Sequence, residues 1–250
     1  MFDRQKIAAD FSRSAAQYAQ HASLQKRVGM ALIEASTPYV RNYSRLLDVG
    51  AGSGELTVLW SCVDKTALDM AEGMCEQARL HGLKAICAPA ETLPLADAST
   101  DVVTSNVMLQ WLENPSLFFG QAQRVLAAQG YLCITHFSQG TLAELGAAFK
   151  TVTGDSSISP FLSHEEMQNK VSDAGFEIVF SQEQVYVESY DNLDALFAYL
   201  RAIGANNKLH SRKRGLLTPR KLAAIRMAYP ASAQGITATW QVGFLIARKI

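Results

Sequence analysis

The stretch LLDVGAGSGEL at residues 46–56 decides the fold, because a short apolar run leads directly into three glycines within five positions. Leu46, Leu47 and Val49 predict a short buried strand. Glycine behind a strand allows a sharp turn and lets a ligand approach the main chain closely. The stretch therefore predicts either a tight turn and nothing more, or a loop that binds a cofactor through its backbone.

Strands and helices alternate after this loop. Further strands are predicted at 65–69, 84–88, 101–107 and 131–137, and helices at 55–61, 70–82 and 116–130. Gly82 and Gly130 are expected to end the last two helices. Because right-handed crossovers bring the carboxyl ends of parallel strands to one edge, ligands are expected to bind there. The predicted fold is α/β, a Rossmann-like, mostly parallel, doubly wound sheet.

The flanking segments predict a lid and a cap around this sheet. Residues 3–36 have apolar residues at helical spacing, and Pro38 ends the pattern. Later helices are predicted at 164–175, 192–205 and 221–230, and alternating strands, placed to pair antiparallel, at 176–190 and 237–249. We expect a single domain over 1–250, with lid helices at about 1–36, a core sheet at about 45–188 and 236–250, and a helical cap at about 189–235.

The composition is that of an ordinary globular protein and argues against several partners. The 250 residues are 48% hydrophobic and 18% charged, with a formal net charge of zero, whereas nucleic-acid-binding proteins are usually basic. No apolar run reaches the ~18 residues of a membrane-spanning helix, and the N-terminus does not resemble a signal peptide. Cys62, Cys75, Cys87 and Cys133 form no CxxC pair, so we expect buried hydrophobes rather than a metal or disulfide site. We expect a cytoplasmic monomer without nucleic-acid or membrane partners.

The spacing of the glycines argues against a dinucleotide. A dinucleotide-binding loop, GxGxxG, opens a helix that holds a pyrophosphate, whereas GxGxG here is followed by Glu55, which would repel one. Asp69 ends the next predicted strand, 19 positions (69 − 50) after Gly50, where an acidic residue accepts hydrogen bonds from ribose hydroxyls. A ribose without a diphosphate indicates an adenosine cofactor such as S-adenosylmethionine. Loop, acid and α/β alternation together disfavour a plain turn, and the loop spacing with Glu55 disfavours a dinucleotide-dependent oxidoreductase.

The stretches LLDVGAGSG, LDMAEGM, AETLPLADASTDVV and GYLCITHF, within residues 46–137, resemble the ordered motifs of class I S-adenosylmethionine-dependent methyltransferases. Such proteins usually carry an aspartate directly before the Ala-Glu pair, where this chain has Pro89. Proline has neither a side-chain acceptor nor a backbone N–H, so the adenine contacts are expected either to be weaker here or to be made by Glu91 or main-chain groups. The cofactor residues that the resemblance implies are Gly50, Gly52 and Gly54 at the methionine part, Asp69 at the ribose, Ala90 and Glu91 at the adenine, Asn106 at the sulfonium, and also Asp48 and Met70.

The stretches FSRSAAQYAQHASLQ, SNVMLQW and IGANN…RKRGLLT, with HFSQGTLAEL and the ending TATWQVGFLIARK, resemble the malonyl-acyl-carrier-protein O-methyltransferases of biotin synthesis, the BioC family. The resemblance implies methyl transfer to the free carboxylate of a malonyl thioester, carried by acyl carrier protein or by coenzyme A. The ester masks the charge, so that enzymes of fatty-acid synthesis can extend the chain.

This reaction requires positioning rather than acid–base catalysis. A carboxylic acid with a pKa near ~4 is already ionised at neutral pH, so no general base is needed to form the nucleophile. The protein has to hold the oxygen in line with the methyl group and sulfur, at roughly 3 Å, and to exclude water. We therefore predict no catalytic acid or base and no metal ligand.

Basic and aromatic residues are the candidates for substrate binding. An arginine fork suits a carboxylate and a basic stretch steers an acidic carrier protein, although residues 209–215 (LHSRKRG) also fit a solvated loop. Arg201, with apolar neighbours in AYLRAIGA, is the best candidate for a buried contact. The aromatic and histidine candidates also fit structural roles. The predicted substrate-binding residues are Tyr18, Gln110, Trp111, His136, Arg201, Arg212, Lys213 and Arg214.

Two other functions share the core motifs. A small-molecule or quinone-ring methyltransferase would need a base or an activated carbon, and an apolar rather than a basic cap. A methyltransferase-like protein without turnover would keep the cofactor site. The intact glycine loop and Asp69 argue against that function, whereas Pro89 leaves it open.

Overall fold

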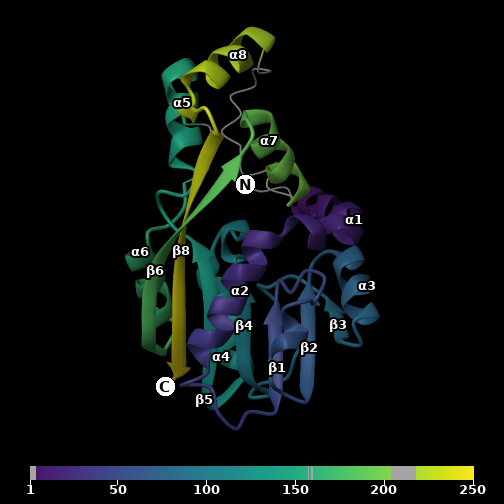
Figure 1. Ribbon diagram of the computed structural model, residues 1–250. Coiled ribbons are helices and arrows are strands. Elements are labelled where there is room, and N and C mark those ends of the chain that lie inside the picture. Colours follow the sequence, from purple (N-terminus) through teal and green to yellow (C-terminus); the bar gives the residue numbers. More distant parts are fainter. Residues whose placement is uncertain (1–3, 157, 159, 204–217) are drawn as a thin grey trace.

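The computed structural model describes residues 4–156, 158, 160–203 and 218–250. Its sheet has the strand order β3-β2-β1-β4-β5-β8-β6, with the short β7 beside β8. β1 to β5 pair in parallel, and β8 pairs antiparallel with both β5 and β6 (Figure 1). The predicted fold and the antiparallel late strands are confirmed. The strands are β1 (Arg45–Val49), β2 (Asp64–Asp69), β3 (Lys84–Cys87), β4 (Thr100–Asn106), β5 (Leu126–Phe137), β6 (Phe176–Tyr190), β7 (Ala231–Ser232) and β8 (Gly235–Lys249).

The strand order reverses at β1, and this reversal places the ligand crevice. The chain leaves β1 toward β2 and β3 on one side and returns to β4 on the other. The loops that follow the carboxyl ends of these strands diverge at such a reversal and leave a crevice. The glycine loop follows β1 and Asp69 ends β2, so both lie at this crevice.

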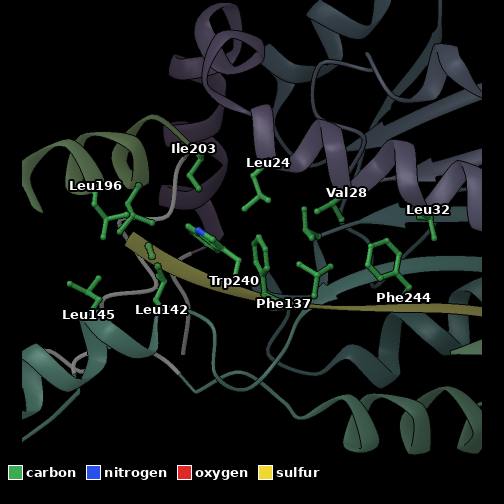
Figure 2. Packing of buried hydrophobic residues seen from close by; sticks show 14 of the residues in the cluster. Leu24, Val28, Leu32, Phe137, Leu142, Leu145, Leu196, Ile203, Trp240 and Phe244 are labelled. Carbon is green, nitrogen blue, oxygen red and sulfur yellow. The ribbon is translucent and has the colours of Figure 1, made fainter. Parts of the chain in front are cut away.

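Two hydrophobic layers enclose the sheet, because successive strand residues point to opposite faces. Leu46 belongs to the layer packed on α2, and Leu47 to the layer packed on α4 and α6. Figure 2 shows part of the first layer, where Val28 and Leu32 of α2 lie beside Phe244 of β8. The helices are α1 (Arg4–His21), α2 (Ser23–Ser36), α3 (Glu72–Leu80), α4 (Pro115–Val125), α5 (Ala143–Thr153), α6 (His164–Asp173), α7 (Leu193–Ala202) and α8 (Pro219–Ala228), with 3₁₀ turns η1 (Thr57–Leu59) and η2 (Leu109–Trp111).

β6 and β8 continue past the parallel strands as a long antiparallel pair (Figure 1). Their pairing runs from Phe176 opposite Lys249 to Tyr190 opposite Ile236. α5, α7 and α8 lie around the far end of this pair (Figure 1). The extended strands therefore carry these three helices above the carboxyl edge of the parallel sheet.

Several segments differ from the sequence prediction. The helical pattern predicted at 3–36 is divided into α1 and α2 over its described part, 4–36, because the backbone leaves helical geometry at Ala22 (φ −85°, ψ 35°). Residues 55–61 form only the short turn η1. The predicted helix 116–130 ends at Val125, and β5 begins directly after it. Nothing in the sequence prediction corresponds to α5.

Gly130 lies inside β5 rather than at a helix end. A Cβ atom at Gly130 would lie 2.9 Å from the carbonyl oxygen of Asp101 and 3.0 Å from that of Ala127. The pairing of β4 with β5 shifts register between Thr100 and Val102. Glycine is therefore needed here for close backbone approach, a role that sequence spacing does not distinguish from a helix stop.

No helix in the described part of the chain is long and apolar enough to cross a membrane. Cys75 and Cys133 are buried, as predicted, whereas Cys62 is only half-buried and Cys87 is exposed. Cys87 ends β3, the edge strand of the sheet, where one side of the strand is uncovered.

Candidate functional site

The glycine loop is held against the end of β2 by its own backbone. The N–H groups of Gly50 and Ala51 donate to the carbonyl oxygen of Leu68 at 2.8 and 3.1 Å. The N–H of Gly52 donates to Oδ2 of Asp69 at 3.0 Å. These bonds fix the loop directly beside the predicted ribose-binding carboxylate.

Gly52 and Gly54 of the loop face different surroundings. A Cβ atom at Gly52 (φ +56°) would meet nothing nearer than Cε1 of Tyr18 at 3.8 Å, so this side of the loop is open. A Cβ atom at Gly54 (φ +81°) would lie 2.5 Å from Cδ1 of Leu83 and 3.1 Å from Cβ of Ala78. Gly54 packs against α3, away from the crevice, which corrects its predicted place beside the cofactor.

Two carboxylates lie beside the loop, Asp69, which is half-buried, and Asp48, which is buried. Asp69 accepts hydrogen bonds from the N–H groups of Gly52 and Ala71 at 3.0 and 2.9 Å, one on each oxygen. Burial raises the pKa of Asp69, although these donors oppose the rise. Asp48 accepts a hydrogen bond from Oγ1 of Thr57 at 2.6 Å. Burial, supplemented by the charge of Asp69, raises the pKa of Asp48 to about 7 against the effect of this hydrogen bond.

Two adjoining pockets at the strand ends gather the predicted cofactor residues other than Gly54. The first, here called the crevice, is lined among others by Gly50, Gly52, Asp69, Met70, Ala90, Glu91 and Asn106. The second, here called the loop pocket, is lined among others by Asp48, Gly50, Gly52, Asn106, Lys26 and Glu55. The strand ends therefore bring together residues that are far apart in the sequence.

The crevice fits an adenosine cofactor. Each oxygen of Asp69 accepts one backbone hydrogen bond and keeps a lone pair that a ribose hydroxyl can use. The open side of Gly52 leaves room for a ligand against the main chain. Pro89 also lines the crevice, so the main chain offers no N–H at that position. Glu55 lies 3.8 Å from Lys26 at the loop pocket, which leaves no net positive charge there for a pyrophosphate.

Asn106 is fixed by both ends of its amide. Its Nδ2 donates to the carbonyl oxygen of Gln25 at 2.9 Å, and its Oδ1 accepts from Oγ1 of Thr135 at 2.7 Å. These bonds tie α2 and β5 to the end of β4, where the crevice and the loop pocket meet. Asn106 thus lines the site while holding three elements in register.

A third pocket adjoins the crevice, with which it shares Phe11, Tyr18, Val107 and Trp111, and is here called the apolar pocket. Its walls include Phe137, Leu142, Ile203 and Trp240, which are labelled in Figure 2. The predicted substrate residues Tyr18, Gln110 and Trp111 also line it. No lysine or arginine of the described part of the chain does so.

Tyr18 stands where the three pockets meet, because it lines all of them. The ring of Phe11 contacts Tyr18 and Trp111 edge to face, with centroids 6.1 and 5.5 Å apart. Burial, and secondarily the charge of Asp69, raises the pKa of Tyr18. The phenol is therefore neutral at physiological pH and can donate a hydrogen bond at the junction.

His136 lies away from these pockets. It is fully buried in β5, with Nε2 3.1 Å from Nδ1 of His164 at the start of α6 and the two rings stacked. Neighbouring strand residues point to opposite faces, so Phe137 lines the apolar pocket while His136 points toward α6. Burial, and then His164, lowers the pKa of His136 to about 4. His136 is a neutral packing residue, which corrects its predicted place at the substrate.

The expected buried contact of Arg201 is wrong. Arg201 is exposed in the last turn of α7. It directly follows the buried Leu200 and therefore points about 100° away from the buried face of the helix. Arg212, Lys213 and Arg214 lie outside the described residues. An arginine fork for a carboxylate is therefore not found at the apolar pocket among the described side chains.

The sequence analysis misses Gln25, a buried residue of α2 that lines both the loop pocket and the apolar pocket. Its Oε1 accepts a hydrogen bond from the hydroxyl of Tyr199 at 3.3 Å. The available signal is its spacing of seven positions (25 − 18) from Tyr18, which is two helical turns. The break at Ala22 makes that signal weak.

Asp48→Asn is expected to change how stability depends on pH. The folded-state pKa of Asp48 is raised from 3.8 to about 7, so its contribution to stability is fully present below pH ~4 and is lost as pH rises through about 7. The neutral amide removes this loss. From pH 5 to pH 8, the natural protein should lose about 2–3 kcal/mol more of its free energy of unfolding than the variant does. Urea unfolding of both proteins at the two pH values measures the difference; equal pH dependence would contradict a buried, proton-binding Asp48.

Comparison with known protein families places a methyltransferase domain at residues 47–134. Two relatives, both named malonyl-[acyl-carrier protein] O-methyltransferase, match almost the whole chain. The protein of Methylococcus capsulatus is 31% identical over 252 residues, which cover 96% of this chain and 92% of the relative. The protein of Xylella fastidiosa is 35% identical over 256 residues, which cover 97% of this chain and 86% of the relative.

A solved structure confirms the architecture. The YcgJ protein of Bacillus subtilis matches with a TM-score of 0.64 at 16% identity, over 90% of this chain and 98% of that one. Identity this low supports the fold alone. The detailed arrangement at the strand ends therefore rests on the residues of this chain.

Proposed function

Because the chain belongs to the family of malonyl-[acyl-carrier protein] O-methyltransferases, we propose that it esterifies the free carboxylate of a malonyl thioester on acyl carrier protein, an early step of biotin synthesis. It is an S-adenosylmethionine-dependent methyltransferase. The near full-length match to relatives of this name carries the proposal, since it includes the lid and cap segments as well as the cofactor-binding core.

S-adenosylmethionine, when bound, supplies a methyl group on a positively charged sulfur. Asp69 binds the ribose through the lone pairs that its backbone donors leave free. Ala90 and Glu91 border the adenine, and Asp48 stands at the methionine part in the loop pocket. The cofactor residues of this proposal are Asp48, Gly50, Gly52, Asp69, Met70, Ala90, Glu91 and Asn106.

The acceptor carboxylate needs no base, because it is ionised at neutral pH. Tyr18, at the junction of the three pockets, donates a hydrogen bond from its neutral phenol to one carboxylate oxygen and leaves the other oxygen to attack. A neutral donor orients the nucleophile without the full charge pairing that an arginine would impose. The ring of Phe11 contacts those of both Tyr18 and Trp111, and in this proposal these aromatic rings exclude water.

The carrier approaches from the cap side in this proposal. Arg201 is exposed on α7, and the stretch that contains Arg212, Lys213 and Arg214 follows it in the chain. Such a basic segment attracts an acidic carrier protein in a salt-dependent way and serves malonyl-coenzyme A as an alternative carrier. We further propose a single domain with lid helices, core sheet and cap, acting as a cytoplasmic monomer without nucleic-acid or membrane partners.

The direct test is methyl transfer from labelled S-adenosylmethionine to malonyl-acyl carrier protein, with acetyl-acyl carrier protein as the matched substrate that lacks a carboxylate. Label is expected on the malonyl form alone and should be released by mild base, as from an ester. Absence of label on both, with cofactor binding shown separately, would favour a small-molecule methyltransferase or a cofactor-binding protein without turnover.

The same assay tests Tyr18. Tyr18→Phe should lower kcat/KM for the malonyl substrate by about 10- to 100-fold, the effect of one hydrogen bond to a charged group. Cofactor affinity should change little. Tyr131→Phe, in the middle of β5 and outside the three pockets, is the control for loss of a phenol. Equal rates for the two variants would remove Tyr18 from the acceptor site.

A further inference from the structure

The turn after β4 is strained and heavily fixed. Val107 has φ +42°, which is a rare conformation for a β-branched residue. Its N–H donates to the carbonyl oxygen and to Oγ1 of Thr135 at 3.1 and 3.0 Å. Its carbonyl oxygen accepts a hydrogen bond from Nε2 of Gln110. Strain of this kind persists only where surrounding contacts impose it, and it is concentrated at binding sites.

Two buried side-chain atoms among the residues that line the apolar pocket have no hydrogen-bond partner in the described part of the chain, the acceptor Oε1 of Gln110 and the donor Nε1 of Trp240. Oε1 of Gln110 exposes less than 1 Å² and has no hydrogen-bond donor among the described residues. A buried acceptor without a donor is destabilising, and most such atoms in proteins are paired. Rotating the amide by 180° offers no remedy, since it would set an oxygen against the carbonyl oxygen of Val107. Oε1 of Gln110 is therefore an acceptor that a bound ligand with an N–H or O–H donor would satisfy.

The position of Gln110 indicates which ligand supplies that donor. Gln110 lines the apolar pocket but neither the crevice nor the loop pocket, so the cofactor is not the partner. The apolar pocket shares Tyr18, Val107 and Trp111 with the crevice, so an acceptor that reaches the methyl group extends into it. Phe137, Leu142 and Ile203, labelled in Figure 2, line this pocket with hydrocarbon side chains, beside Trp240, whose Nε1 is a donor rather than an acceptor.

The chemistry of the acceptor narrows the donor further. The malonyl carboxylate is ionised and the thioester carbonyl has no proton, so neither can donate to Oε1. The first donor along the molecule is the amide N–H two carbons beyond the thioester sulfur, in the arm shared by acyl carrier protein and coenzyme A. We propose that Oε1 of Gln110 accepts a hydrogen bond from this amide N–H and so fixes the depth to which the acceptor arm enters. This inference rests on the proposed function. Because Oε1 is covered, the arm reaches it by displacing an adjacent apolar side chain.

The experiment is a cycle of enzyme and substrate changes. The substrates are the malonyl thioester of N-acetylcysteamine, which contains this amide, and its isostere in which an ester oxygen replaces the N–H. For the natural enzyme, the replacement should lower kcat/KM by about 10- to 100-fold, because two acceptors then face each other. For Gln110→Leu, the two substrates should differ by less than about threefold, since no acceptor remains to be left unpaired. Gln182→Leu, an exposed position on β6, should keep the natural discrimination.

The outcomes separate this inference from the proposed function. Failure of the natural enzyme to methylate malonyl-acyl carrier protein would contradict the proposed function itself. Methylation with equal discrimination by the natural enzyme and Gln110→Leu would overturn the role of Gln110 alone. A merely structural role would lower the melting temperature and both rates together, leaving their ratio unchanged.

Discussion

Gly52→Leu is expected to lower the affinity for S-adenosylmethionine by at least about 100-fold, equivalent to ~2.7 kcal/mol. The leucine side chain would enter the space between the loop and Tyr18. A Cβ atom at Gly52 has no nearer neighbour than Cε1 of Tyr18 at 3.8 Å, and both residues line the crevice. Leucine at that position therefore occupies the volume that the cofactor requires. Isothermal titration with the cofactor measures the loss directly.

Gly82→Leu is the matched control for this substitution. Gly82 also has a positive φ, +77°, but a Cβ atom there meets nothing within 4 Å, and the residue lies at the end of α3 outside the crevice. Both variants carry the backbone strain of a left-handed leucine, about 1–2 kcal/mol. Both should lose similar stability in urea, while Gly82→Leu binds the cofactor normally. Normal binding by Gly52→Leu as well would show that the cofactor does not pass over this loop.

Asp69→Ala is expected to raise the dissociation constant for the cofactor by about 10- to 100-fold. The loss of hydrogen bonds between a carboxylate and ribose hydroxyls accounts for roughly 1–3 kcal/mol. The substitution also frees the N–H groups of Gly52 and Ala71, which loosens the loop. Equilibrium titration gives the affinity, and urea unfolding reports the stability separately.

Asp64→Ala, at the first residue of the same strand, provides the control for Asp69→Ala. Asp64 is exposed at the amino end of β2, away from the crevice at its carboxyl end, so its removal should leave cofactor affinity unchanged. Asp69→Asn keeps the shape but loses the charge and one acceptor oxygen, and should fall between the natural protein and Asp69→Ala. Identical affinities for all four proteins would remove Asp69 from the cofactor site.

The positions of the cofactor residues follow from the sequence because they depend on short-range rules. Gly50 and Asp69 directly follow or end predicted strands, and parallel strands end at one edge. Glu91 follows the third strand and Asn106 ends the fourth, so the same rule brings them to the crevice. Small errors in strand length do not disturb this edge.

The errors of the sequence analysis arise where distant backbones meet. Gly54 and Gly130 look like ligand-loop and helix-stop glycines, yet each is required by close packing against another segment. His136 is displaced from the predicted substrate site by a strand alternation of one residue, which reverses the face of the sheet. Arg201 is exposed because it lies off the buried face of α7, which Leu196, Leu200 and the following Ile203 form at helical spacing.

The sequence by itself determined the α/β class, the family and S-adenosylmethionine as the cofactor, since local periodicity, glycine spacing and motif order all lie within short windows of the chain. The tertiary structure alone decided that Tyr18 stands at the junction of three pockets and that Gln110 keeps an unpaired oxygen. These features depend on how lid, sheet and cap pack, and the free energy of such packing comes from contacts between residues remote in sequence. No local pattern records which polar atoms that packing leaves without a partner.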